Sequence, residues 1–191
     1  MAHDTKTALL DAAEHVVRRK GYDGFSYADL AASVGIRKAS IHYHFPAKAD
    51  LSLALMQRYL AGFEASCAAI EAAHPTAAGR LAALIDHYRS ATQDGRCLCL
   101  CLSFSGSRDA LSEDVQKVIA EFRAAAAGWI ADVFALANTD GTINAPADPR
   151  REAAATLATL EGAQLAARAA HDPAGYDKAV DLLRARLRDA A

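Results

Sequence analysis

The side chains best suited to recognise another molecule are concentrated in residues 35–45, which read G-I-R-K-A-S-I-H-Y-H-F. Arginine, lysine, serine, histidine and tyrosine all form hydrogen bonds with phosphate oxygens or with the edges of bases. Ile41 and Phe45 are four residues apart, so on a helix they lie on one face and leave the other face polar and partly cationic. The stretch is therefore a candidate helix for contacting nucleic acid.

A second short helix is predicted directly before this stretch. Ser26 is a suitable N-cap, and Asp29 places a negative charge in the first turn, where the helix dipole favours it. Gly35 is suited to end the helix, because glycine adopts the positive φ of many helix C-caps without strain. Two short helices joined at a glycine form a helix-turn-helix, whose second helix enters the major groove of DNA.

Three side chains of the second helix are candidates for reading base edges, namely Arg37, Lys38 and His42. Arginine or lysine at such a position favours guanine, which presents two hydrogen-bond acceptors in the major groove. Ser40 is small enough to let the helix lie deep in the groove.

The stretch Ser26–Leu51, S-Y-A-D-L-A-A-S-V-G-I-R-K-A-S-I-H-Y-H-F-P-A-K-A-D-L, resembles the DNA-binding signature of the TetR family of one-component transcriptional regulators. That signature has a helix-turn-helix, an aromatic-His-Phe run and then a lysine, which are here Tyr43-His44-Phe45 and Lys48. The resemblance implies that Tyr43, His44 and Lys48 contact DNA phosphates. It also implies a homodimeric repressor that a small-molecule inducer releases from an inverted-repeat operator. Beyond the first fifty or so residues, only the helix plan and one Gly-Arg-Cys-Leu stretch are similar.

Apolar residues recur at three- and four-residue spacing along most of the chain, which predicts an all-α protein of about nine helices. We expect a three-helix helix-turn-helix DNA-binding domain at 1–48 and a larger helical domain for ligand binding and dimerisation at 49–191. There is no run of about 18 apolar residues, so no membrane span is predicted. The N-terminal sequence M-A-H-D-T-K is polar, and we therefore expect a cytoplasmic protein.

The net charge of −2 does not by itself indicate nucleic-acid binding. Residues 1–50 contain seven Lys or Arg and six Asp or Glu, whereas the remainder contains fourteen and seventeen. DNA affinity would therefore come from the local placement of cations and from two copies acting together.

The resemblance also places a ligand pocket among the fifth to eighth helices. The candidate lining residues are Tyr88, Phe104, Phe122, Trp129, Glu161 and Gln164. Aromatic residues at helical spacing are typical of an ordinary core, but Glu161 and Gln164 are more specific because they lie close to an otherwise apolar stripe. The sequence indicates no cofactor and does not identify the inducer.

Four cysteines, Cys67, Cys97, Cys99 and Cys101, are candidates for thiol chemistry. Structural disulfides are not expected in a cytoplasmic protein. The family resemblance puts a helix directly after residue 95, which would bring Cys97 and Cys101 to one face and point Cys99 elsewhere.

Three hypotheses for these cysteines remain open. They are small hydrophobic residues that pack beside leucines. Alternatively, Cys97, Cys99 and Cys101 sense electrophiles or oxidants, with Cys97 activated by Arg96 and a helix N-terminus. The third hypothesis is a soft metal site, and it ranks last because the C-x-C-x-C spacing is not a usual zinc motif. That site would use Cys97 and Cys101 with Cys67 or a histidine such as His87.

The last two predicted helices carry apolar stripes that predict a pairing surface. The stripes consist of Ala153, Leu157, Leu160, Gln164 and Ala167, and of Tyr176, Val180, Leu183 and Leu187. We expect these helices to form a four-helix bundle with a second copy, because an inverted-repeat operator requires two reading heads related by symmetry. The alternative is that they only cover the core of their own chain.

Two other classes of protein compete with a regulator. The sequence has no Gly-rich phosphate loop, no H-E-x-x-H and no G-x-S-x-G, so an enzyme is not expected. The remaining candidate for catalysis is a cysteine nucleophile with His87. A helical interaction module without DNA binding is the third class.

Overall fold

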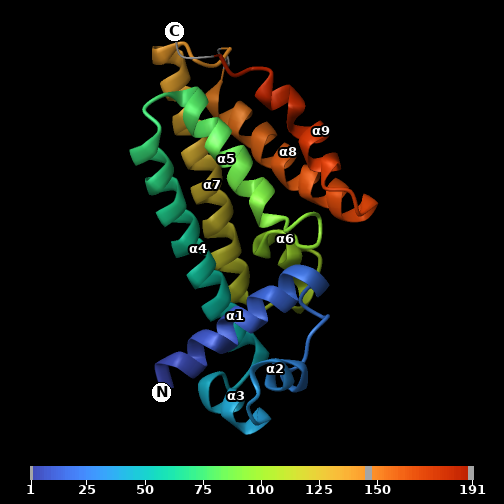
Figure 1. The fold of residues 1–191 in the computed structure, drawn as a ribbon. Coiled ribbons are helices and arrows are strands. Elements are labelled where there is room, and N and C mark those ends of the chain that lie inside the picture. The colour runs from blue at the N-terminus through green and yellow to red at the C-terminus, as the bar shows by residue number, and fades with distance from the viewer. Residues whose placement is uncertain (1, 145–147, 189–191) are drawn as a thin grey trace. The chain divides into compact units, whose positions relative to one another are not determined.

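The computed structural model describes residues 2–144 and 148–188, and their regular structure is entirely helical (Figure 1). This confirms the predicted all-α class and, within the described residues, the predicted number of nine α-helices. These are α1 (Ala2–Lys20), α2 (Tyr27–Val34), α3 (Lys38–His44), α4 (Lys48–Ala73), α5 (Ala77–Ala91), α6 (Leu100–Ser105), α7 (Glu113–Asp140), α8 (Pro149–Ala170) and α9 (Ala174–Arg184), with a 3-10 turn η1 (Arg108–Ala110) before α7. Among the described residues, no helix is both long and apolar enough to cross a bilayer.

The chain divides into two compact units. The first unit comprises Met1–Ala61 and Leu100–Glu121, and the second comprises Gly62–Cys99 and Phe122–Ala191. Helices α4 and α7 each contribute residues to both units. The functional boundary at residue 48 stays a prediction.

The helix-turn-helix in the first unit is built by the capping residues that the sequence indicated. The backbone N–H of Ser26 donates to the Asp29 carboxylate over 2.8 Å, and the N–H of Asp29 donates to the Ser26 hydroxyl over 3.3 Å. This reciprocal capping box satisfies two donors at the start of α2. Gly35 ends the helix with φ 74°, a left-handed conformation that glycine adopts without a steric penalty.

Tyr27 fixes the junction between α3 and α4 inside the first unit. Its hydroxyl donates to the carbonyl oxygens of Phe45 over 3.0 Å and Ala47 over 2.6 Å. Burial raises the pKa of Tyr27 to about 12, with smaller contributions from Asp50 and Tyr22. The chain therefore leaves α3 in a defined direction.

In the second unit α8 and α9 lie side by side, and α5 packs against both (Figure 1). The Tyr176 hydroxyl of α9 donates to the carbonyl oxygen of Ile85 in α5 over 2.9 Å. Arg89 forms two hydrogen bonds, 2.7 and 2.9 Å long, with the carboxylate of Asp177. Polar contacts thus fix the position of α9 on α5.

The apolar stripes of α8 and α9 point into their own unit. Ala153, Leu157, Leu160, Gln164 and Ala167 of α8 are buried, as are Tyr176, Val180 and Leu183 of α9. The apolar face of each helix was predicted correctly, but we expected that face to contact a second copy of the chain. The alternative prediction, that the stripes cover the core of their own chain, describes the structure.

Candidate nucleic-acid interface and ligand groove

Helix α3 has one buried face and one exposed face. Ile41 is fully buried and Phe45 nearly so, whereas Tyr43 is 83% exposed. Arg37 and Lys38 are exposed at the start of the helix. The residues that could reach a groove or a phosphate therefore lie on the outer surface, and the two apolar residues anchor the helix.

The outer surface beside α3 is hollowed. The hollow has a volume of about 500 Å³ and is lined by Thr5, Ile36, Arg37, Ala39, Ser40, Tyr43 and His44. Ala39 and Ser40 have short side chains in this surface, so a nucleic-acid backbone can approach the helix closely between Arg37 and Tyr43. The role that we expect for Ser40 stays a prediction.

The two histidines of α3 have different surroundings. Nδ1 of His42 lies 3.1 Å from the carbonyl oxygen of Pro46, and its ring packs on Tyr27 with the centroids 4.9 Å apart. When Nδ1 carries the proton and donates to Pro46, the neutral ring keeps Nε2 as an acceptor. The ring of His44 contacts that of Tyr43 edge-on, with a centroid separation of 5.2 Å. His44 therefore also supports the exposed tyrosine.

Lys48 lies in an aromatic cage. Its Nζ atom is 4.3 Å from the centroid of the Tyr22 ring and 4.2 Å from that of Phe25. The same ammonium group donates a hydrogen bond of 3.1 Å to the carbonyl oxygen of Phe25. Burial lowers the pKa of Lys48, and Asp23 partly opposes this effect. These contacts give Lys48 a structural role within the unit, and the phosphate contact implied by the family stays a prediction.

The predicted pocket residues are mostly part of the core. Tyr88, Phe122 and Gln164 are buried in the second unit, whereas Phe104 is buried in the first unit with its ring 5.8 Å from that of Tyr22. Gln164 accepts a hydrogen bond from the N–H of Cys99 over 2.8 Å and donates to the carbonyl oxygen of Tyr88 over 3.0 Å. Its polar atoms therefore hold backbone segments together.

Glu161 and Trp129 have partners on the side chains of other helices. Glu161 accepts a hydrogen bond of 2.6 Å from the guanidinium of Arg123. The Trp129 indole N–H donates to the Glu71 carboxylate over 2.8 Å. Trp129, one of the six residues predicted to contact a ligand, also lines a groove in the second unit.

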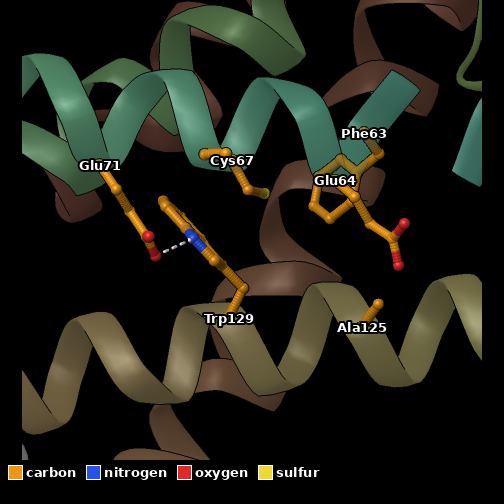
Figure 2. A pocket seen from close by; sticks show the side chains of 7 residues that line it. Phe63, Glu64, Cys67, Glu71, Ala125 and Trp129 are labelled. Carbon is orange, nitrogen blue, oxygen red and sulfur yellow. Dashed lines mark hydrogen bonds between the residues drawn. The ribbon is translucent and has the colours of Figure 1, made fainter. Parts of the chain in front are cut away.

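This groove lies between α4 and α7 in the second unit and has a volume of about 250 Å³ (Figure 2). Its lining consists of Phe63, Glu64, Cys67, Ala68, Glu71, Ala125 and Trp129. Glu64 and Glu71 are not among the residues predicted to form a site. Their spacing was the available signal, since two carboxylates seven residues apart fall on one face of a helix that is otherwise largely apolar.

The cysteine-rich segment differs from the expected helix. Helix α6 begins at Leu100, so Cys97 and Cys99 precede it in a segment without regular secondary structure and Cys101 lies inside it. The helix expected directly after residue 95 is wrong, because Gln93, Asp94 and Gly95 all adopt positive φ and delay helix formation. Cys97, Cys99 and Cys101 are all reduced and buried.

The contacts of the cysteines favour packing over sensing. The Cys97 thiol donates to the side-chain oxygen of Gln93 over 3.3 Å, and its residue surface is fully covered. A reactive thiol needs access as well as thiolate character, so the redox-sensor hypothesis for Cys97, Cys99 and Cys101 would require an opening of this segment. Within the described residues, no three His, Cys, Asp or Glu side chains are grouped to hold a metal ion.

Comparisons with known proteins agree with this architecture. The family model for bacterial regulatory proteins of the tetR family matches residues 9–55, and the model for the tetracyclin repressor-like C-terminal domain matches residues 77–183. A TetR-family transcriptional regulator from Agrobacterium tumefaciens has a solved structure that is 29% identical, with a TM-score of 0.93 over 98% of this chain and 100% of that chain.

Two further relatives extend the comparison. The structure of AibR in complex with isovaleryl coenzyme A and operator DNA has a TM-score of 0.72 at 21% identity, covers 98% of this chain and 100% of that one, and shows a shared fold. IcaR of Staphylococcus aureus, a negative transcriptional regulator of the biofilm operon icaADBC, is 44% identical over 46 residues, which are 24% of this chain and 25% of IcaR. The chain spans about a quarter of the length of the curated relatives it matches.

A capped helix-turn-helix with an exposed second helix, followed by a helical second unit, is the architecture expected of a bacterial regulatory protein of the matching family. The two matching family models together cover most of the sequence. The chain belongs to the TetR family.

Proposed function

We propose that this chain is a transcriptional repressor that binds an inverted-repeat operator as a homodimer and leaves it when a small-molecule inducer binds. The observation that supports this most strongly is the orientation of α3, with Ile41 inside the unit and Arg37, Lys38 and Tyr43 on its surface. IcaR, which is 44% identical over 46 residues, is a negative regulator, and AibR has been solved with both a ligand and operator DNA. A DNA-binding role places the protein in the bacterial cytoplasm.

The exposed face of α3 supports separate roles for its residues. Arg37 and Lys38 supply cations for guanine edges or phosphates, and the Tyr43 hydroxyl is placed to donate to a phosphate oxygen. The Nε2 acceptor of His42 suits the amino group of adenine or cytosine, which is a donor in the major groove. His44 positions Tyr43 through the contact of their rings.

The homodimer is proposed to form through the outer faces of α8 and α9, opposite the buried stripes. Leu182 of α9 is 80% exposed and Leu165 of α8 is 48% exposed, and they are two of the three large exposed hydrophobic residues described. Leu165 continues a stripe of small exposed residues on α8 at three- and four-residue spacing, formed by Ala155, Ala158, Gly162 and Ala169. Small residues allow a partner helix to approach closely, which suits a four-helix bundle.

A gel-shift titration on DNA from upstream of the gene tests the proposal. We expect the wild-type protein to retard this DNA as a dimer, and Arg37→Ala to lose affinity by roughly fivefold or more. Arg150→Ala is a matched control, because Arg150 is exposed on α8, outside the proposed interface. Equal losses in both variants would contradict the assignment of α3, and catalytic turnover without DNA binding would support the enzyme class instead.

A further inference from the structure

The groove between α4 and α7 carries negative charge along one wall. Glu64 and Glu71 are exposed on the same face of α4, with Cys67 between them, as Figure 2 shows. Glu71 accepts the hydrogen bond of Trp129, and Glu64 has no hydrogen bond or ion pair with any described residue. None of the lining residues is a lysine, arginine or histidine. The groove is therefore complementary to a positive charge.

The remaining surface of the groove is aromatic and apolar. Trp129 is contributed by α7 and Phe63 by α4, and the Phe63 ring is supported by the Phe122 ring at a centroid distance of 5.0 Å. The faces of aromatic rings carry partial negative charge and attract organic cations, and tryptophan does so most strongly. Because Glu71 binds the indole N–H, it fixes the ring in the groove.

Cys67 lies at the bottom of the groove as a neutral thiol. Burial, together with smaller contributions from the charges of Glu71 and Glu64, raises the pKa of the Cys67 thiol to about 12. A soft metal ion requires a thiolate ligand, so this environment disfavours a metal. The negative charge comes from carboxylates on the rim, and the bottom is uncharged.

We infer that this groove binds a compact organic cation, with its flat or alkyl body on Trp129 and Phe63 and its positive charge between Glu64 and Glu71. The inference rests on the proposed function, because it specifies the chemical class of the inducer. The volume of about 250 Å³ limits the ligand to a small molecule, since it lies just below the usual range of about 300–1,000 Å³ for ligand pockets in proteins.

Calorimetric titration with two probes of similar shape tests the inference on the full chain. N-methylquinolinium carries a permanent positive charge, and quinoline is uncharged at neutral pH. We expect the cation to bind at least about fivefold more tightly than quinoline, because one favourable charge contact raises affinity by about this factor. Trp129 is the only tryptophan in the sequence, so a saturable change in its fluorescence locates the bound cation.

Charge-neutralising variants test the residues. Glu64→Gln with Glu71→Gln keeps the size of both side chains and an acceptor for Trp129, and we expect it to abolish the preference for the cation. Glu113→Gln with Asp114→Asn removes the same charge from the exposed first turn of α7, about three turns before Ala125, and should leave the preference unchanged. Equal binding of the two probes by the wild type, or an unchanged preference in the Glu64 and Glu71 double variant, overturns the inference.

The two proposals fail separately in this design. Calorimetry measures binding of the cation to the groove in the absence of DNA. Gel shifts measure operator binding in the absence of the cation. Loss of cation binding with intact operator binding overturns only the ligand class. Failure of the wild type to bind any DNA overturns the proposed function, whatever the calorimetry shows.

Discussion

The ammonium group of Lys48 donates a hydrogen bond of 3.1 Å to the carbonyl oxygen of Phe25. This contact joins the first turn of α4 to the segment that precedes α2. The centroids of the Phe25 and Tyr22 rings lie 4.2 and 4.3 Å from the charge, and the two rings contact each other edge-on. One side chain thus holds together the two ends of the helix-turn-helix, and α3 lies between them in sequence.

Replacing Lys48 by methionine should destabilise this unit. The variant keeps the apolar stem but loses the charged hydrogen bond and both ring contacts, so we expect the free energy of unfolding to fall by about 1–3 kcal/mol. Urea denaturation followed by circular dichroism measures the change. The phosphate-contact hypothesis instead predicts unchanged stability. It also predicts that the slope of log K for DNA binding against log salt concentration becomes shallower by about one.

Tyr27 should make the protein sensitive to alkaline pH. Its pKa rises from the usual value of 10.0 to about 12, so above pH 10 the unfolded state loses this proton while the folded state retains it. The contribution of the Tyr27 hydroxyl to the free energy of unfolding is therefore fully present below pH 10. It is lost as the pH rises to about 12. Tyr27→Phe should be less stable at neutral pH by roughly 1–2 kcal/mol, because two carbonyl oxygens lose the hydroxyl proton that they share. Its decline at alkaline pH should be shallower, and an equally steep decline would contradict this role.

Local features of the helix-turn-helix could be predicted because each depends on neighbouring residues. Ser26 with Asp29 caps α2, Gly35 ends it, and the spacing of Ile41 and Phe45 determines which face of α3 is exposed. Periodicity also showed correctly that α8 and α9 have apolar faces. It could not show what covers those faces, because the same pattern serves a core and a subunit interface.

The long-range pairs could not be predicted. The Lys48 cage joins residues 23 positions apart, and the contact of Glu71 with Trp129 joins residues 58 positions apart. Such pairs depend on how the helices pack, and sequence periodicity does not determine this. The same limit explains Gln164, which looked like a ligand contact because it is polar on an apolar stripe, although its partners are backbone atoms far along the chain.

Gln164→Leu should destabilise the second unit rather than alter ligand specificity. The substitution removes two buried hydrogen bonds, each of which contributes about 1 kcal/mol, so we expect a loss of about 2 kcal/mol or more. Gln57→Leu is a suitable control, because Gln57 is exposed on α4. Equal stability of the two variants in urea denaturation would show that the bridging contacts of Gln164 are unimportant.

Introducing a charge on the outer face of α9 should separate the proposed dimer. Leu182 is 80% exposed, so Leu182→Glu leaves the fold of the chain intact but places an unpaired charge in a four-helix interface. We expect a monomer by analytical ultracentrifugation, with unchanged circular dichroism. Ala72→Glu, at an exposed position of α4, should remain dimeric. A dimeric Leu182→Glu protein would place the interface elsewhere.

Selection of bound DNA from a random pool is the sharpest test of the proposed repressor, because an inverted repeat is enriched only when an exposed reading helix has a twofold partner. We expect the wild type to enrich an inverted repeat with half-sites at a fixed separation, and Arg37→Ala to relax the preference at one position of each half-site. Enrichment of no sequence, or of a single half-site without its inverted copy, would contradict the proposal.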